Sequence, residues 1–322
     1  MGSLLLSFFA VYASVIGIGI LRHWDIDSGS ERQLVLERKT YLISTVLAYL
    51  MAFELFSLFL FIYTADALHT LFVGAMCAAG SLNVGSYGYS VLLVKIVNVV
   101  LCGAWLVVNH VDNQAQDYPL IRAKYKLLIV LTVMLLLGAF LLIGYFGGLR
   151  ADVITSCCGT LFSESRQSIT NELAGVGSYT AKVILLVSFF FLIRFGVRFL
   201  WSRRSARLFS SLSVWFFVFA LVAVVSFISL YFYEMPTHHC PFCVLQKDYY
   251  YIGYPMYIAL LSGVISGLSL GILQRYGQVP SLAAILPRAQ FKLCVTSLVS
   301  YTLFLGIALY PMLFSDFRLE GY

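Results

Sequence analysis

Long apolar runs separated by short polar segments dominate this sequence. Each run contains about 20 residues, the length that a helix needs to cross the hydrocarbon core of a membrane. None alternates like a barrel strand, and a helix satisfies its backbone hydrogen bonds within its own segment. We therefore predict an all-α polytopic membrane bundle of eight transmembrane helices, at about residues 3–21, 41–63, 87–109, 127–146, 179–201, 211–233, 249–273 and 293–314.

The composition supports a membrane protein. Hydrophobic residues make up 61% of the 322 residues and charged residues 11%, against about a quarter charged in soluble domains. The connections are too short to form a second core, so we expect one integral-membrane domain over residues 1–322, with the lipid bilayer as its main partner. The net charge of +6 follows from membrane topology, and no nucleic-acid partner is expected.

Lys and Arg gather in alternate connections, namely those after the first, third, fifth and seventh runs. The positive-inside rule places these connections in the cytoplasm. Both termini then face outward, as do the connections near 64–86, 148–178 and 234–248. We expect a multi-pass protein of a bacterial inner membrane with its active side facing the periplasm.

The predicted outward connections contain five of the seven cysteines: Cys77, Cys157, Cys158, Cys240 and Cys243. The first connection is rich in Gly and apolar, so we expect a re-entrant or interfacial segment near 71–86, with an ordinary Gly-rich turn as the alternative. Cys157 and Cys158 are adjacent. Oxidised, they would form a strained disulfide, and reduced, they would offer two thiolates to one soft ion.

The third connection has the densest chemistry, because it combines thiols, imidazoles and a thioether within a few residues. A thiolate is both a two-electron redox centre and a soft metal ligand. We expect the two cysteines to lie at the start of a helix, where unpaired N–H groups lower the pKa of a thiol. The candidates are Met235, His238, His239, Cys240 and Cys243.

Residues 240–247, with the sequence CPFCVLQK, resemble the Cys-Pro-Leu-Cys-x-x-Gln-Arg signature of the disulfide-bond formation protein B family of membrane quinone reductases. The resemblance covers these eight residues. It implies that Cys240 and Cys243 form a redox pair and that Gln246 and Lys247 lie near a bound quinone. A second pair would then be Cys157 and Cys158.

Three functions fit these residues. The first is a thiol–disulfide oxidoreductase that passes electrons between the outer cysteine pairs and a quinone, with a periplasmic thiol protein as its partner. The second is a copper-like soft-metal site for delivery or permeation, served by a metal carrier and formed by Cys77, Met235, His238 and His239 together with Cys157, Cys158, Cys240 and Cys243. The third is a non-catalytic subunit of a respiratory or transport complex, with a haem on His69 and on His238 or His239.

Three polar residues fall inside predicted spans: Glu54, Lys95 and Asn98. Glu54 lies near the middle of the second span, at a depth that matches Lys95 in the third. Intramembrane ionisable groups are costly, so they indicate either a proton or substrate path or a structural ion pair between two helices.

Overall fold

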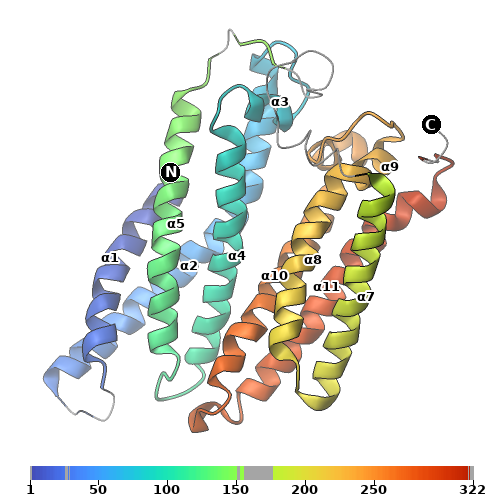
Figure 1. Ribbon diagram of the computed structural model, residues 1–322. Coiled ribbons are helices and arrows are strands. Elements are labelled where there is room, and N and C mark those ends of the chain that lie inside the picture. Colours follow the sequence, from blue (N-terminus) through green and yellow to red (C-terminus); the bar gives the residue numbers. More distant parts are fainter. Residues whose placement is uncertain are drawn as a thin grey trace. The chain divides into compact units, whose positions relative to one another are not determined.

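The computed structural model describes residues 2–25, 28, 30–150, 153–155, 177–317 and 319 (Figure 1). This part of the chain consists of helices and turns and contains no strand. Eight helical segments are long and apolar enough to cross a membrane. The predicted all-α bundle of eight spans is therefore confirmed, and the prediction that both termini face outward stays a prediction.

The spans are built from long helices with short helical turns between them. The sixth span continues from α8 through a π-helical segment, η2 (Val224–Ile228), into α9 (Ser229–Tyr233). The long helices are α1 (Gly2–His23), α2 (Glu31–Ala67), α4 (Gly88–Asp112), α5 (Ile121–Gly147), α7 (Ser178–Ser202), α8 (Ala206–Ala223), α10 (Gly253–Leu273) and α11 (Leu286–Phe314). The short elements are η1 (Leu68–Leu71), α3 (Ala78–Asn83), η3 (Cys243–Leu245), η4 (Lys247–Tyr249), η5 (Gln274–Tyr276) and η6 (Pro280–Leu282).

Several long helices begin at other residues than the predicted spans do, and two of these differences have a clear physical reason. The second long helix begins at Glu31 rather than near residue 41, because hydropathy detects only the apolar part of a helix and its first turns here are polar. The seventh span begins at Gly253 rather than at 249. Tyr250 and Tyr251 have φ values of 52° and 56°, a left-handed conformation that cannot continue a right-handed helix.

The chain forms two compact units. Unit 1 contains residues 1–63, 85–150 and 275–290, and unit 2 contains residues 64–84, 151–274 and 291–322. Each unit thus combines segments that are distant in sequence. The expectation of one integral-membrane domain stays a prediction.

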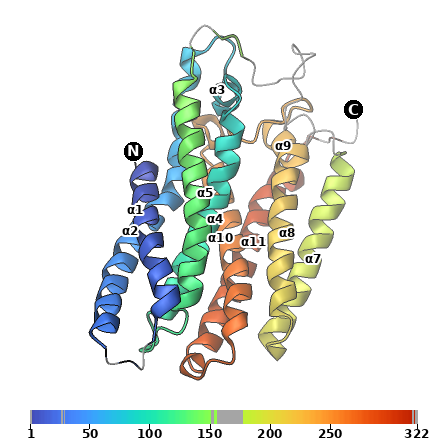
Figure 2. The ribbon, with the colours of Figure 1, turned by 60° about the vertical axis from the view of Figure 1, so that its left-hand side comes forward.

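In unit 1, α5 packs against α1 and α4. Leu6, Leu47, Trp105 and Tyr125 are buried in its core, and the Trp105 indole N–H donates to the Lys124 carbonyl at 3.2 Å. In unit 2, α8 packs against α7 and α10, and both ribbon views show α7 beside α8 (Figure 1, Figure 2).

The helices of unit 2 approach one another at small residues. A Cβ at Gly267 would collide with Ser213, and one at Gly263 would collide with the Tyr301 ring. Ser213 and Ser297 both donate to the Gly263 carbonyl, at 3.4 and 2.9 Å. Close contact through glycine and serine, with hydroxyl hydrogen bonds between helices, is typical of membrane helix packing.

The first of the predicted outward connections contains the short helix α3, whose residues Ala78–Leu82 are buried. Gly74 has φ +85°, and a Cβ there would collide with the Thr155 carbonyl. Thr155 N–H donates to the Val73 carbonyl at 3.0 Å, and its hydroxyl donates to the Gly80 carbonyl at 3.0 Å. The connection is therefore packed inside unit 2 rather than being a simple turn, while its depth in a membrane stays a prediction.

The predicted pairing of Glu54 with Lys95 is present in unit 1. Lys95 Nζ lies 3.1 Å from Glu54 Oε1 and 2.7 Å from Ser57 Oγ, and Ser3 Oγ donates to Glu54 Oε2 at 2.9 Å. Asn98 is outside this network, because its amide donates to the Met134 carbonyl at 3.3 Å. Both charges are buried and have partners, as a structural ion pair requires.

Removing one charge of this pair should destabilise the protein more than removing both. Glu54→Gln leaves a buried ammonium without a counterion, and we expect it to lower the free energy of unfolding by about 3 kcal/mol. The double variant Glu54→Gln/Lys95→Met should recover most of that loss. Denaturation of the purified protein in detergent micelles measures both. A double variant that is no more stable than Glu54→Gln would show that the pair has a role other than charge balance.

Candidate functional site

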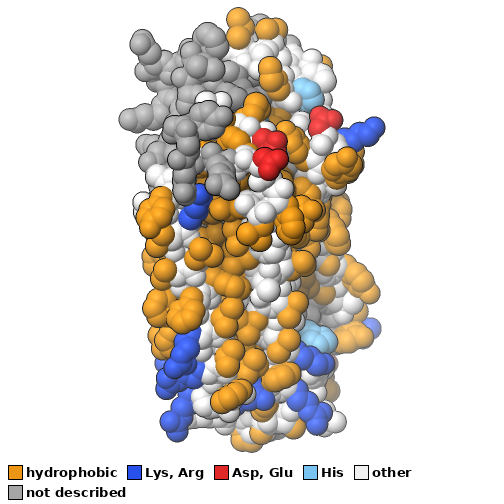
Figure 3. Space-filling view, turned by 90° about the vertical axis from the view of Figure 1, so that its right-hand side faces the viewer, with side chains coloured by type: hydrophobic (Ala, Val, Ile, Leu, Met, Phe, Trp, Pro, Cys, Tyr) orange, Lys and Arg blue, Asp and Glu red, His pale blue; other side chains and the backbone are white. Residues whose placement is uncertain are grey.

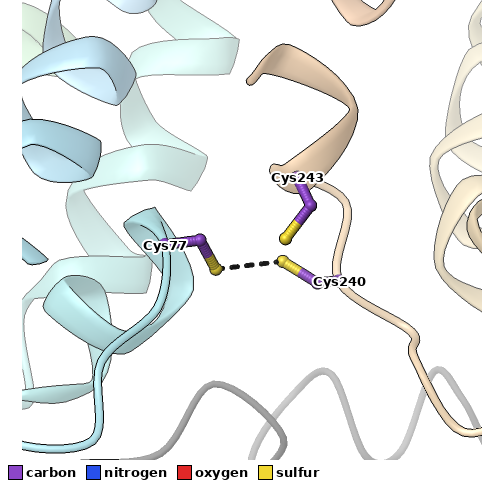
Figure 4. Close-up of side chains that lie close together, drawn as sticks. All are labelled: Cys77, Cys240 and Cys243. Carbon is purple, nitrogen blue, oxygen red and sulfur yellow. Dashed lines mark hydrogen bonds between the residues drawn. The ribbon is translucent and has the colours of Figure 1, made fainter. Parts of the chain in front are cut away.

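Three thiols from two separate connections meet in unit 2. The Sγ atoms of Cys77, Cys240 and Cys243 all lie within 4.8 Å of one another, and the Cys77 and Cys240 sulfurs are 3.4 Å apart (Figure 4). All three side chains are buried, with 0%, 5% and 7% of their surface exposed. Of the predicted outer cysteines, these three form one cluster, and Cys157 and Cys158 lie outside the described residues.

The carboxylate of Asp66 positions the Cys77 connection. Asp66 Oδ1 accepts the Ala78 backbone N–H at 3.0 Å and the Gln246 side-chain N–H at 3.0 Å. Gln246 also approaches the Met76 carbonyl at 3.5 Å. One carboxylate oxygen thus joins the residue after Cys77 to the segment after Cys243.

Two tyrosines fix the backbone around Cys240 and Cys243. The Tyr233 hydroxyl donates to the Cys240 carbonyl at 2.7 Å and accepts the Val244 N–H at 2.9 Å. From α10, the Tyr257 hydroxyl donates to the Pro241 carbonyl at 2.6 Å. These bonds satisfy backbone groups that a buried loop would otherwise leave without partners.

Sequence reasoning missed the roles of Asp66, Tyr233 and Tyr257. These roles depend on contacts between segments that are separated in the chain. The sequence does contain one signal that could have identified Asp66, because it is a carboxylate at the predicted outward end of a long apolar helix.

The predicted lowering of the thiol pKa by a helix start is wrong for Cys240. Only the single turns η3, which begins at Cys243, and η4 precede α10, which begins at Gly253. The hydrogen bond to Cys243, together with burial, raises the pKa of Cys240, although contacts from Cys77 and the Phe242 N–H act in the opposite direction. Cys240 is therefore a protonated thiol at neutral pH unless a cation binds its sulfur.

His238 is next to the thiol cluster. Its Nε2 atom lies 3.3 Å from Cys243 Sγ, and its ring packs edge-on against Tyr233 with centroids 4.5 Å apart. Burial, aided by the nearby His239, lowers the pKa of His238. The imidazole is thus neutral at physiological pH, which is the form that binds metals.

His239 is directed away from the cluster. Its Nδ1 donates to the Val225 carbonyl at 2.9 Å, within the π-helical segment η2. The wider hydrogen-bond spacing of a π turn changes which carbonyls the helix itself uses, and such segments often occur at functional sites. This histidine therefore anchors the loop to α8–η2–α9.

The remaining predicted residues belong to the same two connections as the cluster. The Met235 side chain is partly exposed, and the Met235 carbonyl accepts the His238 backbone N–H at 3.4 Å. Lys247 is exposed at the first residue of η4. His69 hydrogen-bonds through Nδ1 to the Asp66 carbonyl. The quinone and haem expectations stay predictions.

Comparison of the chain with protein-family models, with curated proteins and with solved structures found no match. The local resemblance of residues 240–247 to a quinone reductase family therefore stays an expectation.

Replacing Asp66 should separate Cys77 from Cys240. In a variant that keeps only these two cysteines, the short bifunctional reagent dibromobimane should bridge them and become fluorescent. We expect Asp66→Ala to reduce bridging severalfold, because the buried Ala78 N–H loses its acceptor. The matched control is Asp248→Ala, which removes an exposed carboxylate from the connection that contains Cys240. Equal bridging in Asp66→Ala and in the control would contradict this positioning role.

Proposed function

We propose that this protein is a membrane metal-handling protein that binds a soft cation, foremost Cu(I), through Cys77, Cys240, Cys243 and His238. The observation that carries the proposal is the meeting of three buried sulfurs within 4.8 Å of one another with an imidazole nitrogen 3.3 Å from one of them. Thiolate sulfur and neutral imidazole are the usual ligands of copper and zinc.

Two of the spacings between these atoms are close to those of a filled site. With bonds of about 2.3 Å to sulfur and about 2.0 Å to nitrogen, tetrahedral ligands lie roughly 3.5–3.8 Å apart. The Cys77–Cys240 and Cys243–His238 distances are 3.4 and 3.3 Å. Binding would therefore need shifts of only a few tenths of an ångström in these pairs, together with loss of the thiol protons.

Thioether sulfur near the cluster favours Cu(I) over Zn(II). Met76 directly precedes Cys77 and is 76% exposed, and Met235 lies three residues before His238 and is 46% exposed. Methionine is a ligand for Cu(I), whereas zinc sites use cysteine, histidine and carboxylate. The two exposed thioethers would receive Cu(I) from a carrier before it reaches the buried thiolates.

The role we propose is reception and delivery of the ion rather than its transport. Among the described residues, the soft side chains in the spans of unit 2 are Met256, Cys294 and Met312, too few to form a continuous series of sites across a membrane. The positive-inside rule, applied to the basic connections, supports a position of the cluster on the periplasmic side of a bacterial inner membrane. A periplasmic metal carrier is the expected partner.

The same sulfurs support a second candidate, the thiol–disulfide relay. The 3.4 Å between Cys77 and Cys240 is short enough for exchange within a three-thiol cluster. Burial of all three thiols limits attack by a partner protein, and exchange requires such access. In this reading Gln246 and Lys247 would contact a quinone, and the Gln246 amide already donates to Asp66.

Metal titration separates the two candidates. We expect the protein, purified under anaerobic conditions, to compete with a chromophoric chelator for one equivalent of Cu(I), and Cys157→Ser/Cys158→Ser should leave this equivalent unchanged. His238→Ala and Cys77→Ser should weaken binding by more than the roughly 10- to 100-fold typical of an outer-shell change. His239→Ala is the matched control and should retain the affinity.

A parallel titration with Zn(II) tests the choice of ion, and tighter zinc binding at the same residues would replace Cu(I) in the proposal. Absence of binding for both ions would overturn the metal site. If thiol exchange then persisted in His238→Ala, the relay would become the function that the geometry supports.

A further inference from the structure

A groove of about 790 Å³ runs along the exposed side of α7 in unit 2. This volume falls within the range of about 300–1,000 Å³ typical of small-molecule sites. One part of the groove is apolar and is lined by Leu186, Phe190, Ile193 and Val197, and the other part is lined by Arg194, Arg198 and Arg204.

Position along the helix produces this division. Leu186, Phe190, Arg194 and Arg198 follow one another at four-residue intervals, so they lie along the same side of α7. The apolar pair precedes the charged pair along α7, and Arg204 follows the end of the helix at Ser202. Figure 3 shows the corresponding pattern on the surface, with Lys and Arg side chains gathered below a broad band of hydrophobic side chains.

These three guanidinium groups form no ion pair with a carboxylate in the described part of the chain. Among the described residues, the ion pairs are Lys95 with Glu54 and Lys124 with Asp112, both in unit 1. Arg203 differs from its neighbours, because it stacks on the Phe199 and Phe291 rings at 5.9 and 5.8 Å. The groove therefore combines unpaired positive charge with an adjoining apolar surface.

The depth of Arg194 makes this charge significant. It lies eight residues before the end of α7, which corresponds to roughly 12 Å along the helix. An exposed guanidinium at that depth in a membrane must either extend to the interface or bind an anion. An anion that enters from the interface with its own apolar chains would satisfy both parts of the groove.

We propose that this groove binds an anionic diacyl phospholipid, with the phosphate at Arg194, Arg198 and Arg204 and an acyl chain along Leu186, Phe190, Ile193 and Val197. Guanidinium is the side chain best suited to phosphate, because it offers paired N–H donors in one plane. Basic pockets beside transmembrane helices on the cytoplasmic side are known to bind anionic headgroups, and the basic connection after α7 is predicted to be cytoplasmic.

Trp201 lines the same groove and is 89% exposed, so its fluorescence reports on the occupant. The full chain is reconstituted in phosphatidylcholine vesicles in which a minor fraction is either brominated phosphatidylglycerol or brominated phosphatidylcholine. Subtracting the signal of Trp201→Phe isolates Trp201. We expect the brominated anionic lipid to be enriched at Trp201 by at least about fivefold over the zwitterionic lipid.

Arg194→Gln/Arg198→Gln should abolish this preference while leaving quenching by phosphatidylcholine unchanged, which also shows that the variant is folded. The matched control is Arg207→Gln/Arg288→Gln, which removes the same charge from exposed residues outside the groove and should retain the preference. Equal quenching by both lipids, or persistence of the preference in the groove variant, would overturn the proposal. Loss of the preference in the control would do so as well, because it would indicate general attraction to the bilayer surface.

Discussion

The two hydrogen bonds accepted by Asp66 are the constraint on which the candidate site depends. Asp66 and Gln246 are 180 residues apart in the chain, and the same oxygen accepts the N–H of the residue after Cys77. A carboxylate that accepts both bonds fixes the relative position of two connections that are far apart in the chain. This pair of bonds, with the contact of Gln246 to the Met76 carbonyl, holds Cys77 beside the segment that carries Cys240 and Cys243.

Hydrogen bonds to the backbone explain how the thiols can be buried without secondary structure around them. Residues between α9 and α10 form only single helical turns, so their N–H and carbonyl groups need other partners. Tyr233 and Tyr257 provide them from the two neighbouring spans. Placing the hydroxyls on long helices gives the loop the rigidity of those helices, which a ligand set requires if it is to hold one geometry.

The spans could be predicted from the sequence because hydropathy depends only on neighbouring residues. The helix starts at Glu31 and Gly253 could not, since one depends on polar helical turns and the other on the left-handed backbone of Tyr250 and Tyr251. Residue type and predicted topology were sufficient to place Cys77 with the outward thiols. They could not show that His238 approaches Cys243 while His239 turns toward Val225, because adjacent histidines are distinguished only by tertiary contacts.

The π-helical segment η2 determines the angular position, about the helix axis, of every later residue in the sixth span. A π turn contains one residue more than an α turn, and each residue of an α-helix advances the chain by about 100°. Removing one residue from Val224–Ile228 would therefore rotate Tyr233 by about that angle around the helix axis, away from the Cys240 carbonyl and the Val244 N–H. The hydrogen bonds that hold the loop of Cys240 and Cys243 thus depend on the number of residues in a helix that contributes none of the sulfur atoms.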